Sequence, residues 1–196
     1  ATPKTGSTAL YMALRKHAQI VLAGQPRFKH MTVRKYESHF EPFLEGAYGL
    51  KPERVAAMRE PLEYLRSWYK YRQRPELTRA SQSTENVSFE EFALAAIASD
   101  PPAYAAVGPQ LEFLSNATGE VGIHHLFSHE DGLMTAFISE RLGKDVRTKP
   151  HNVSPIVPTD LSAEADQRIR TALAADYAIW DRIRAAGGYL PTGYGT

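Results

Sequence analysis

The chain has 196 residues, of which 43% are hydrophobic and 23% charged, an ordinary composition for one globular domain with a substantial core. Its formal net charge of +1 gives no bulk attraction for nucleic acid or an acidic membrane surface, and its lack of cysteine excludes disulfides, thiol nucleophiles and Cys-based metal sites. No apolar run approaches the ~20 residues of a membrane helix, and no signal peptide is visible. We therefore expect a single cytoplasmic domain over residues 1–196, with no nucleic-acid or membrane partner.

Short apolar runs alternate with amphipathic stretches along the chain. The apolar spacing predicts helices, and the short apolar runs predict buried strands. The predicted helices cover residues 8–17, 61–72, 89–98, 109–117, 131–143 and 162–186, and the predicted strands cover 19–24, 54–61 and 121–127. Ser162 is the expected N-cap of the last helix, and Gly187-Gly188 is expected to end it. The polar stretch 74–88 predicts a mobile surface loop that could act as a lid.

This alternation is typical of an α/β fold with three layers, α/β/α, around a central parallel sheet. In such folds ligands bind outside the carboxyl ends of the strands. The segments "PKTGST" (3–8) and "REP" (59–61) both fit that position. Since no strand precedes the first of them in the sequence, we expect the first strand of the sheet to be missing from the chain.

The segment "PKTGST" has the composition of a loop that holds an anion at a helix N-terminus. The turn around Gly6 offers backbone N–H groups, Lys4 adds a positive charge, and Thr5, Ser7 and Thr8 add hydroxyl donors. A Walker A loop reads G-x-x-x-x-G-K-[ST], whereas here the lysine comes two residues before the only glycine. The loop is therefore P-loop-like without being a Walker A loop. An ordinary helix start with threonine caps is the alternative.

The sequence "PKTGSTAL" resembles the 5′-phosphosulfate loop of sulfotransferases that use 3′-phosphoadenosine 5′-phosphosulfate (PAPS), which reads P-K-[ST]-G-[ST]-[ST]. The second signature of that family, roughly R-[DEN]-P-x-x-R-x-x-S-x-[YFW], is similar to "REPLEYLRSWY" (59–69). The resemblance implies that Arg59 and Ser67 hold the 3′-phosphate of the nucleotide. Tyr64 departs from the family pattern, because this position often holds Arg, and Arg66 two residues later faces another direction on a helix.

Two further segments are similar to the family. The segment "FSHEDG" (127–132) resembles its Y-E-D-L junction, where Glu130 and Asp131 are more consistent with a structural than a catalytic role. The segment "KPHNVSP" (149–155) resembles the C-terminal part of carbohydrate-type members and their bacterial relatives. That likeness implies that Asn152 and Ser154 contact the nucleotide, with Lys149 as a basic partner.

The resemblance implies transfer of a sulfuryl group from PAPS, as cosubstrate, to a hydroxyl or amine of a carbohydrate or small molecule. Lys4 is the candidate for neutralising charge on the leaving phosphate. "QPRFKHM" (25–31) is similar to the segment that carries the base of cytosolic sulfotransferases, so we assign His30 as general base and Lys29 as a lesser candidate for charge stabilisation. In an extended segment only one of these neighbours would face the site. The alternative is that His30 is a surface histidine beside a basic cluster.

Neither the histidine spacing nor this transfer calls for a metal, so none is predicted. Six aromatic residues could form an acceptor platform or belong to the core: Tyr36, Phe40, Phe43, Trp68, Tyr69 and Tyr71. Two other functions stay open at this point. One is a P-loop kinase acting on a small molecule, and the other is a degenerate member that binds the nucleotide without catalysis. The oligomeric state is not predicted.

Overall fold

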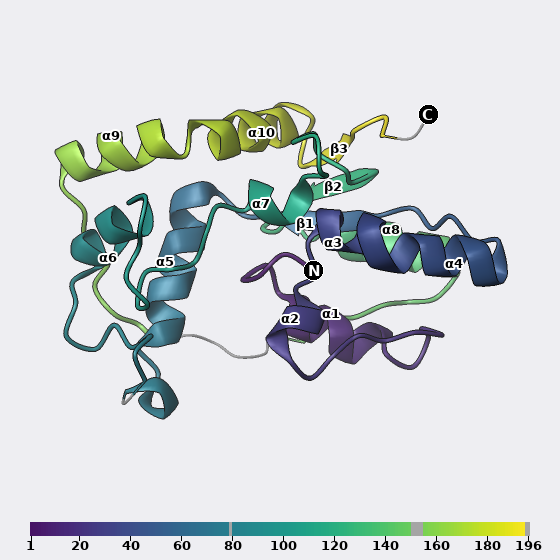
Figure 1. The fold of residues 1–196 in the computed structure, drawn as a ribbon, viewed down its shortest axis with the longest axis horizontal. Coiled ribbons are helices and arrows are strands. Elements are labelled where there is room, and N and C mark those ends of the chain that lie inside the picture. Colours follow the sequence, from purple (N-terminus) through teal and green to yellow (C-terminus); the bar gives the residue numbers. More distant parts are fainter. Residues whose placement is uncertain (79, 150–154, 195–196) are drawn as a thin grey trace. The chain divides into compact units, whose positions relative to one another are not determined.

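A computed structural model describes residues 1–78, 80–149 and 155–194 of the chain (Figure 1). It combines helices with a small sheet, so the general α/β character is confirmed. The helices are α1 (Ser7–Leu14), α2 (Pro26–Lys29), α3 (Val33–Lys35), the π-helical turn η1 (Tyr36–Phe40), α4 (Glu41–Tyr48), α5 (Pro61–Arg72), the 3₁₀ turn η2 (Pro75–Leu77), α6 (Phe89–Ala96), α7 (Leu111–Leu114), α8 (Leu133–Leu142), α9 (Ala163–Ala172) and α10 (Ala174–Ala185). The strands are β1 (Val55–Met58), β2 (His125–Ser128) and β3 (Tyr189–Pro191).

The chain forms two compact units, each built from segments distant in the sequence. The first comprises Ala1–Arg59, Gln110–His151 and Ile179–Thr196, and the second comprises Glu60–Pro109 and Asn152–Ala178. The core of the first unit is made of Val33, Ala56, Met58, Leu114, Ile123, Leu126, Trp180 and Ile183. The core of the second is made of Leu62, Tyr64, Leu65, Tyr69, Phe89, Phe92, Ala93, Ala105, Val107 and Ile169.

The sheet of the first unit has the order β1-β2-β3. β1 and β2 are parallel, with Met58 opposite Ser128, so both strands end at the same edge. The apolar runs predicted these two strands, although β2 begins only at His125. β3 pairs antiparallel to β2, and the sheet is therefore mixed, where a parallel sheet was predicted. The strand β3 has only three residues and forms by pairing with a distant segment, so its own sequence did not predict it.

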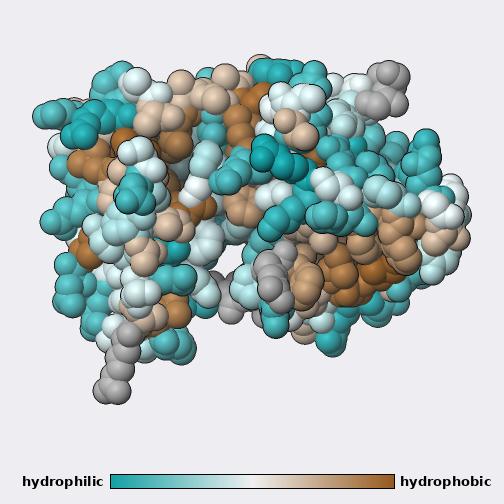
Figure 2. Space-filling model, in the orientation of Figure 1, coloured by the Kyte–Doolittle hydropathy of each residue, from teal (hydrophilic) through white to brown (hydrophobic). Residues whose placement is uncertain are grey.

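The strand predicted over 19–24 is wrong, because this segment has no regular structure. Ile20, Val21 and Leu22 are 40–48% exposed. An apolar run becomes a strand only where a neighbour pairs with its backbone, and the described residues offer this run none. Apolar side chains also reach the surface on the right of Figure 2, in the region of α4, where Phe43 and Tyr48 are exposed.

In the second unit, α5 begins as predicted at Pro61, and the Glu60 carboxylate caps it by accepting the Glu63 N–H at 2.6 Å. The stretch 74–88, predicted as a mobile loop, contains η2 and is anchored to α5. Thr84 is fully buried there, and its hydroxyl donates to the Tyr69 carbonyl at 3.1 Å.

The long helix predicted over 162–186 is divided into α9 and α10 at Leu173, whose φ of −99° and ψ of 22° leave the helical region. The predicted N-cap Ser162 accepts the Ala165 N–H, and both Gly187 and Gly188 have positive φ after the helix ends. Ile169 belongs to the core of the second unit, whereas Trp180 and Ile183 belong to the first. One apolar stripe thus serves two cores.

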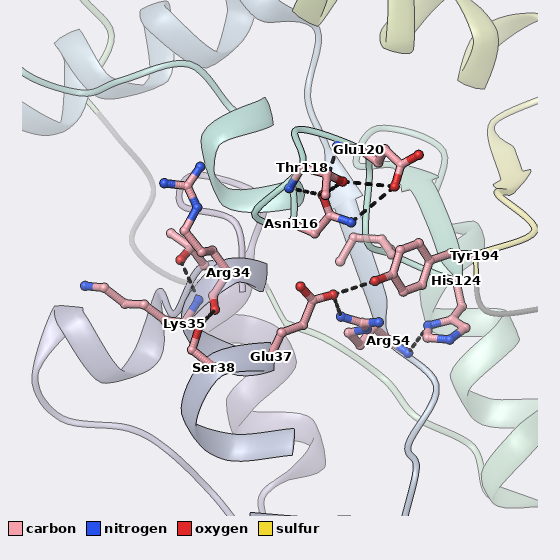
Figure 3. Close-up of polar contacts among 12 residues, drawn as sticks. Arg34, Lys35, Glu37, Ser38, Arg54, Asn116, Thr118, Glu120, His124 and Tyr194 are labelled. Atoms are coloured by element: carbon pink, nitrogen blue, oxygen red, sulfur yellow. Dashed lines mark hydrogen bonds and ion pairs between the residues drawn. The ribbon is translucent and has the colours of Figure 1, made fainter. Parts of the chain in front are cut away.

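A polar cluster closes the amino ends of the parallel strands (Figure 3). Arg54, directly before β1, donates to Glu37 at 2.5 Å, and Tyr194 donates to the same carboxylate oxygen at 2.6 Å. The Arg54 N–H donates to Nδ1 of His124, directly before β2, at 2.9 Å. The carboxyl ends of β1 and β2 lie at the other edge, where Arg59 and His129 follow them.

Candidate anion-binding site

The loop that leads into α1 has an unusual backbone. Gly6 is the N-cap of α1 with a φ of 68°, and Lys4 has a φ of 63°, the only positive φ among the described residues other than glycine. Such a conformation is unfavourable for a side chain and is kept where the surroundings require it. Thr5 between them is buried, and its hydroxyl donates to the Thr2 carbonyl at 2.9 Å. The first turn of α1 contains no acidic residue, and no side chain in the described part of the chain caps its N–H groups.

Arg59 reaches this loop from the end of β1. Its Nη1 donates to the Lys4 carbonyl at 3.3 Å, and its Nε donates to Glu130 at 3.3 Å. The main chain of Arg59 is fixed by Gln110, a fully buried residue whose side chain bonds both the N–H and the carbonyl of Arg59. The two motifs of the sequence therefore meet in the first unit at Lys4 and Arg59.

Lys29 and His30 also contact the loop, but not from an extended segment. Lys29 ends the helix α2 and His30 is its C-cap. Neighbours on a helix are separated by about 100° rather than by the half-turn of a strand. Lys29 donates to the Thr8 hydroxyl at 2.6 Å, and His30 bonds the Ala1 carbonyl at 2.8 Å. The segment is therefore helical where an extended one was expected, and both side chains contact the stretch 1–8.

The hydrogen bond of His30 determines which ring nitrogen is basic. A carbonyl only accepts, so Nδ1 carries the proton, and in the neutral ring Nε2 holds the lone pair. Burial lowers the pKa of His30, and the positive charges of Lys29 and Lys4 lower it further, against the raising effect of the Ala1 carbonyl. Burial also lowers the pKa of Lys29. These effects favour the neutral form of the His30 ring.

His129, which follows β2, also lies beside this loop and was not predicted as a site residue. Its N–H donates to the Met58 carbonyl at 2.8 Å, and its ring atom Cε1 lies 3.0 Å from where a Cβ on Gly6 would be. Burial lowers the pKa of His129, and the charge of Arg59 adds to this. The signal available in the sequence was its position at the carboxyl end of a predicted strand.

The two acids after His129 have the contacts of structural groups. Glu130 accepts from Arg59 and, at 3.1 Å, from the Ser128 hydroxyl. Asp131 is paired with Arg184 at 2.9 Å. These contacts agree with the structural role expected for both carboxylates.

The second signature continues along α5 into the second unit. Ser67 is half-buried on α5 in the second unit, so its convergence with Arg59 on one phosphate stays a prediction. Tyr64, which occupies the usual arginine position, is 2% exposed and donates to the Val107 carbonyl at 3.4 Å. It is a core residue of the second unit. Arg66 is paired with Glu63 at 2.6 Å.

The C-terminal segment of the predicted site is only partly described. Asn152 and Ser154 lie outside the described residues, and Lys149 is exposed. Among the six aromatic candidates, Tyr69 is a core residue, whereas Phe43 is half exposed. Nowhere in residues 1–78, 80–149 and 155–194 do three or more His, Cys, Asp or Glu side chains form a set that could hold a metal ion. Within the same residues, no helix has both the length and the apolar character needed to cross a bilayer.

Comparisons of the chain with protein-family models, with curated proteins and with solved structures found no match. The residues from which we infer a function are those of the loop 1–8 together with Lys29, His30, Arg59 and His129.

Proposed function

We propose that the chain is a PAPS-dependent sulfotransferase that acts on a hydroxyl or amine of a carbohydrate or small molecule. The observation that carries the proposal is the meeting of two motifs at one place. The guanidinium of Arg59, at the end of β1, bonds the carbonyl of Lys4 in the left-handed loop before α1. Two motifs that bind one nucleotide must lie close together, and the contact between Arg59 and Lys4 supports this.

The proposal includes a P-loop-like α/β/α fold for the chain. In support, β1 and β2 are parallel, each is followed along the sequence by a helix, and the candidate residues follow their carboxyl ends. The mixed order introduced by β3 is compatible with this, since antiparallel edge strands occur in such sheets.

The residues of the loop fit an anionic cosubstrate. Lys4, Lys29 and Arg59 supply positive charge around a helix start that has no acid of its own. PAPS, when bound, supplies an activated sulfuryl group. Lys4 and the backbone N–H groups of residues 5–8 would neutralise the charge that develops on the leaving phosphate. Arg59 would hold the 3′-phosphate by charge-assisted hydrogen bonds.

His30 is the proposed base. As the acceptor oxygen attacks sulfur, its proton passes to Nε2 of His30, a new O–S bond forms, and the bond from sulfur to the phosphate oxygen breaks. The products are a sulfate ester and adenosine 3′,5′-bisphosphate. Lys29, which donates to the Thr8 hydroxyl, would stabilise the negative charge next to the reacting group.

A P-loop kinase is less well supported. The lysine precedes the glycine of the loop, and the carboxylate of Glu60, the acid next to Arg59, is used to cap α5 and is a poor Mg²⁺ ligand. The other alternative is a degenerate sulfotransferase that binds the nucleotide without catalysis. It would have the same loop as an active enzyme and would differ from it only in turnover.

Isothermal titration with adenosine 3′,5′-bisphosphate, and separately with ATP and Mg²⁺, tests the proposal. Micromolar binding of the bisphosphate with little response to ATP is the expected result. Preference for ATP would favour the kinase. Binding of the bisphosphate without turnover of PAPS on any acceptor of a broad screen would favour the non-catalytic member.

A further inference from the structure

His129 lies next to both the end of β1 and the N-cap of α1. Its N–H bonds the Met58 carbonyl, which ties the residue between the ends of β1 and β2. Its ring edge, Cε1 and Nδ1, lies 3.0 and 3.7 Å from where a Cβ on Gly6 would be. The ring therefore occupies the space that glycine leaves at the N-cap of α1.

The His129 ring has no hydrogen-bond partner within the described parts of the chain. Two charges act on it, Arg59 from the end of β1 and Glu130 from its own loop. The Glu130 carboxylate accepts hydrogen bonds from Arg59 and Ser128, and its negative charge acts on the imidazole without a hydrogen bond between them. A half-buried imidazole without a partner thus lies beside a guanidinium and a helix start, both of which disfavour a further positive charge.

We propose that His129 takes up a proton when a phosphate-type dianion binds in the loop before α1, and then holds that anion as imidazolium. This inference rests on the proposed function, since the dianion is the 5′-phosphate region of PAPS or of its bisphosphate product. The negative charge reverses the effect of Arg59 on the ring, and the imidazolium adds a donor and a positive charge. In the free protein, burial and the charge of Arg59 lower the pKa of His129. Binding of the anion can therefore raise this pKa into the range where the ring takes up a proton.

Proton uptake by His129 on binding makes the affinity for the anion depend on pH. Proton uptake occurs at pH values between the low pKa of the free state and the higher pKa of the bound state. The His129 contribution to affinity therefore grows as the pH falls through the bound pKa, and it saturates below the free one. Each unit by which binding raises the pKa corresponds to about a tenfold gain in affinity.

The test is an NMR titration of the histidine Cε1–H resonances from pH 5 to 8.5, without ligand and with saturating adenosine 3′,5′-bisphosphate. The His129→Asn variant assigns the resonance. We expect a His129 pKa below the usual 6.5 in the free protein and at least one unit higher with ligand. An unchanged pKa in a complex that does form overturns the inference alone.

Calorimetry gives the second readout, with His39→Asn, which removes an exposed imidazole from η1, as the matched control. The ligand has titratable phosphates of its own, so the quantity compared is the difference between proteins. At pH 8, wild type and His129→Asn should bind the bisphosphate within about threefold. Between pH 8 and pH 6, the wild type and His39→Asn should each gain about three- to tenfold in affinity relative to His129→Asn, because a pKa rise of one unit gives at most about tenfold. Equal pH profiles for wild type and His129→Asn contradict the inference, and no bisphosphate binding by the wild type overturns it together with the proposed function.

Discussion

The side-chain amide of Gln110 brackets the main chain of Arg59. Its Oε1 accepts the Arg59 N–H at 2.9 Å, and its Nε2 donates to the Arg59 carbonyl at 2.7 Å. Gln110 is fully buried, so it acts like a neighbouring strand at the first residue beyond β1. The position from which the Arg59 guanidinium reaches Lys4 is thereby fixed by a residue 51 positions away in the sequence.

Gln110→Met should destabilise the protein. The substitution keeps the volume but leaves two backbone groups of Arg59 without partners, which we expect to lower the free energy of unfolding by about 2–4 kcal/mol. Urea denaturation measures the change. Gln167→Met on the exposed side of α9 is the control and should stay within about 0.5 kcal/mol of the wild type. If the two variants behave alike, the Gln110 amide does not support Arg59 energetically.

Arg59→Ala should weaken the binding of adenosine 3′,5′-bisphosphate by about 2–4 kcal/mol, because it removes charge-assisted hydrogen bonds to a phosphate. Titration calorimetry measures the dissociation constant. Arg66→Ala is the matched control, since it removes a guanidinium that is paired with Glu63 on α5. An unchanged dissociation constant in Arg59→Ala would remove this residue from the 3′-phosphate site.

His30→Ala should lower turnover by roughly 10²–10⁴ and leave the affinity for the bisphosphate intact. In the wild type, the rate should fall on the acid side only below the usual histidine pKa of about 6.5, because burial lowers the pKa of His30 and keeps Nε2 unprotonated at higher pH. Steady-state kinetics from pH 5 to 8 test both points. Unaltered turnover in the variant would place the base elsewhere.

The parts of the fold that could be predicted are those encoded by neighbouring residues. β1 is an apolar run, and α5 starts where Glu60 and Pro61 provide a cap and a first turn. β3 and the break at Leu173 could not be predicted, because the first needs β2 as a partner and the second reflects two separate cores. The same distinction applies to the site. Lys4, Gly6 and Arg59 stand in local motifs, whereas Gln110 and His129 join them only through the pairing of β1 with β2 and the loop contacts at that edge.

The free energy of unfolding should decrease as the pH falls from 7.5 to 5.5. Burial, with a contribution from Arg54, lowers the pKa of His124, and Nδ1 of this ring must stay unprotonated to accept the Arg54 N–H (Figure 3). The unfolded chain takes up a proton near pH 6.5, but the folded state does so only at lower pH, so stability is lost as the pH drops through this range. His30 and His129 act in the same direction.

Urea denaturation at pH 7.5, 6.5 and 5.5 measures this dependence. In His124→Asn the amide oxygen can still accept the Arg54 N–H but does not titrate. We therefore expect a smaller loss of stability between pH 7.5 and 5.5 in this variant than in the wild type. The same loss in both proteins would show that His124 does not contribute to the linkage.

Gly6→Ala should cost more stability than Gly24→Ala, although both glycines have positive φ, 68° and 88°. The backbone penalty for alanine in the left-handed region is about 1–2 kcal/mol. It is at least as large at Gly24, which lies further from the left-handed minimum near +57°. A Cβ on Gly24 meets nothing within 4 Å, whereas one on Gly6 lies 3.0 Å from Cε1 of His129. Any additional cost at Gly6 therefore measures the contact with His129, and we expect about 1 kcal/mol or more for it.

A double-mutant cycle isolates that contact. In a His129→Ala background the ring is absent, so Gly6→Ala should cost no more than Gly24→Ala does in the wild type. Urea denaturation of the four proteins of the cycle, with Gly24→Ala alone and in the His129→Ala background, gives the coupling free energy. A coupling of zero would mean that the His129 ring does not rest on the N-cap of α1 in solution. A coupling of about 1 kcal/mol would tie the identity of residue 6 to the imidazole beside it, since alanine is then excluded by the ring as well as by the backbone.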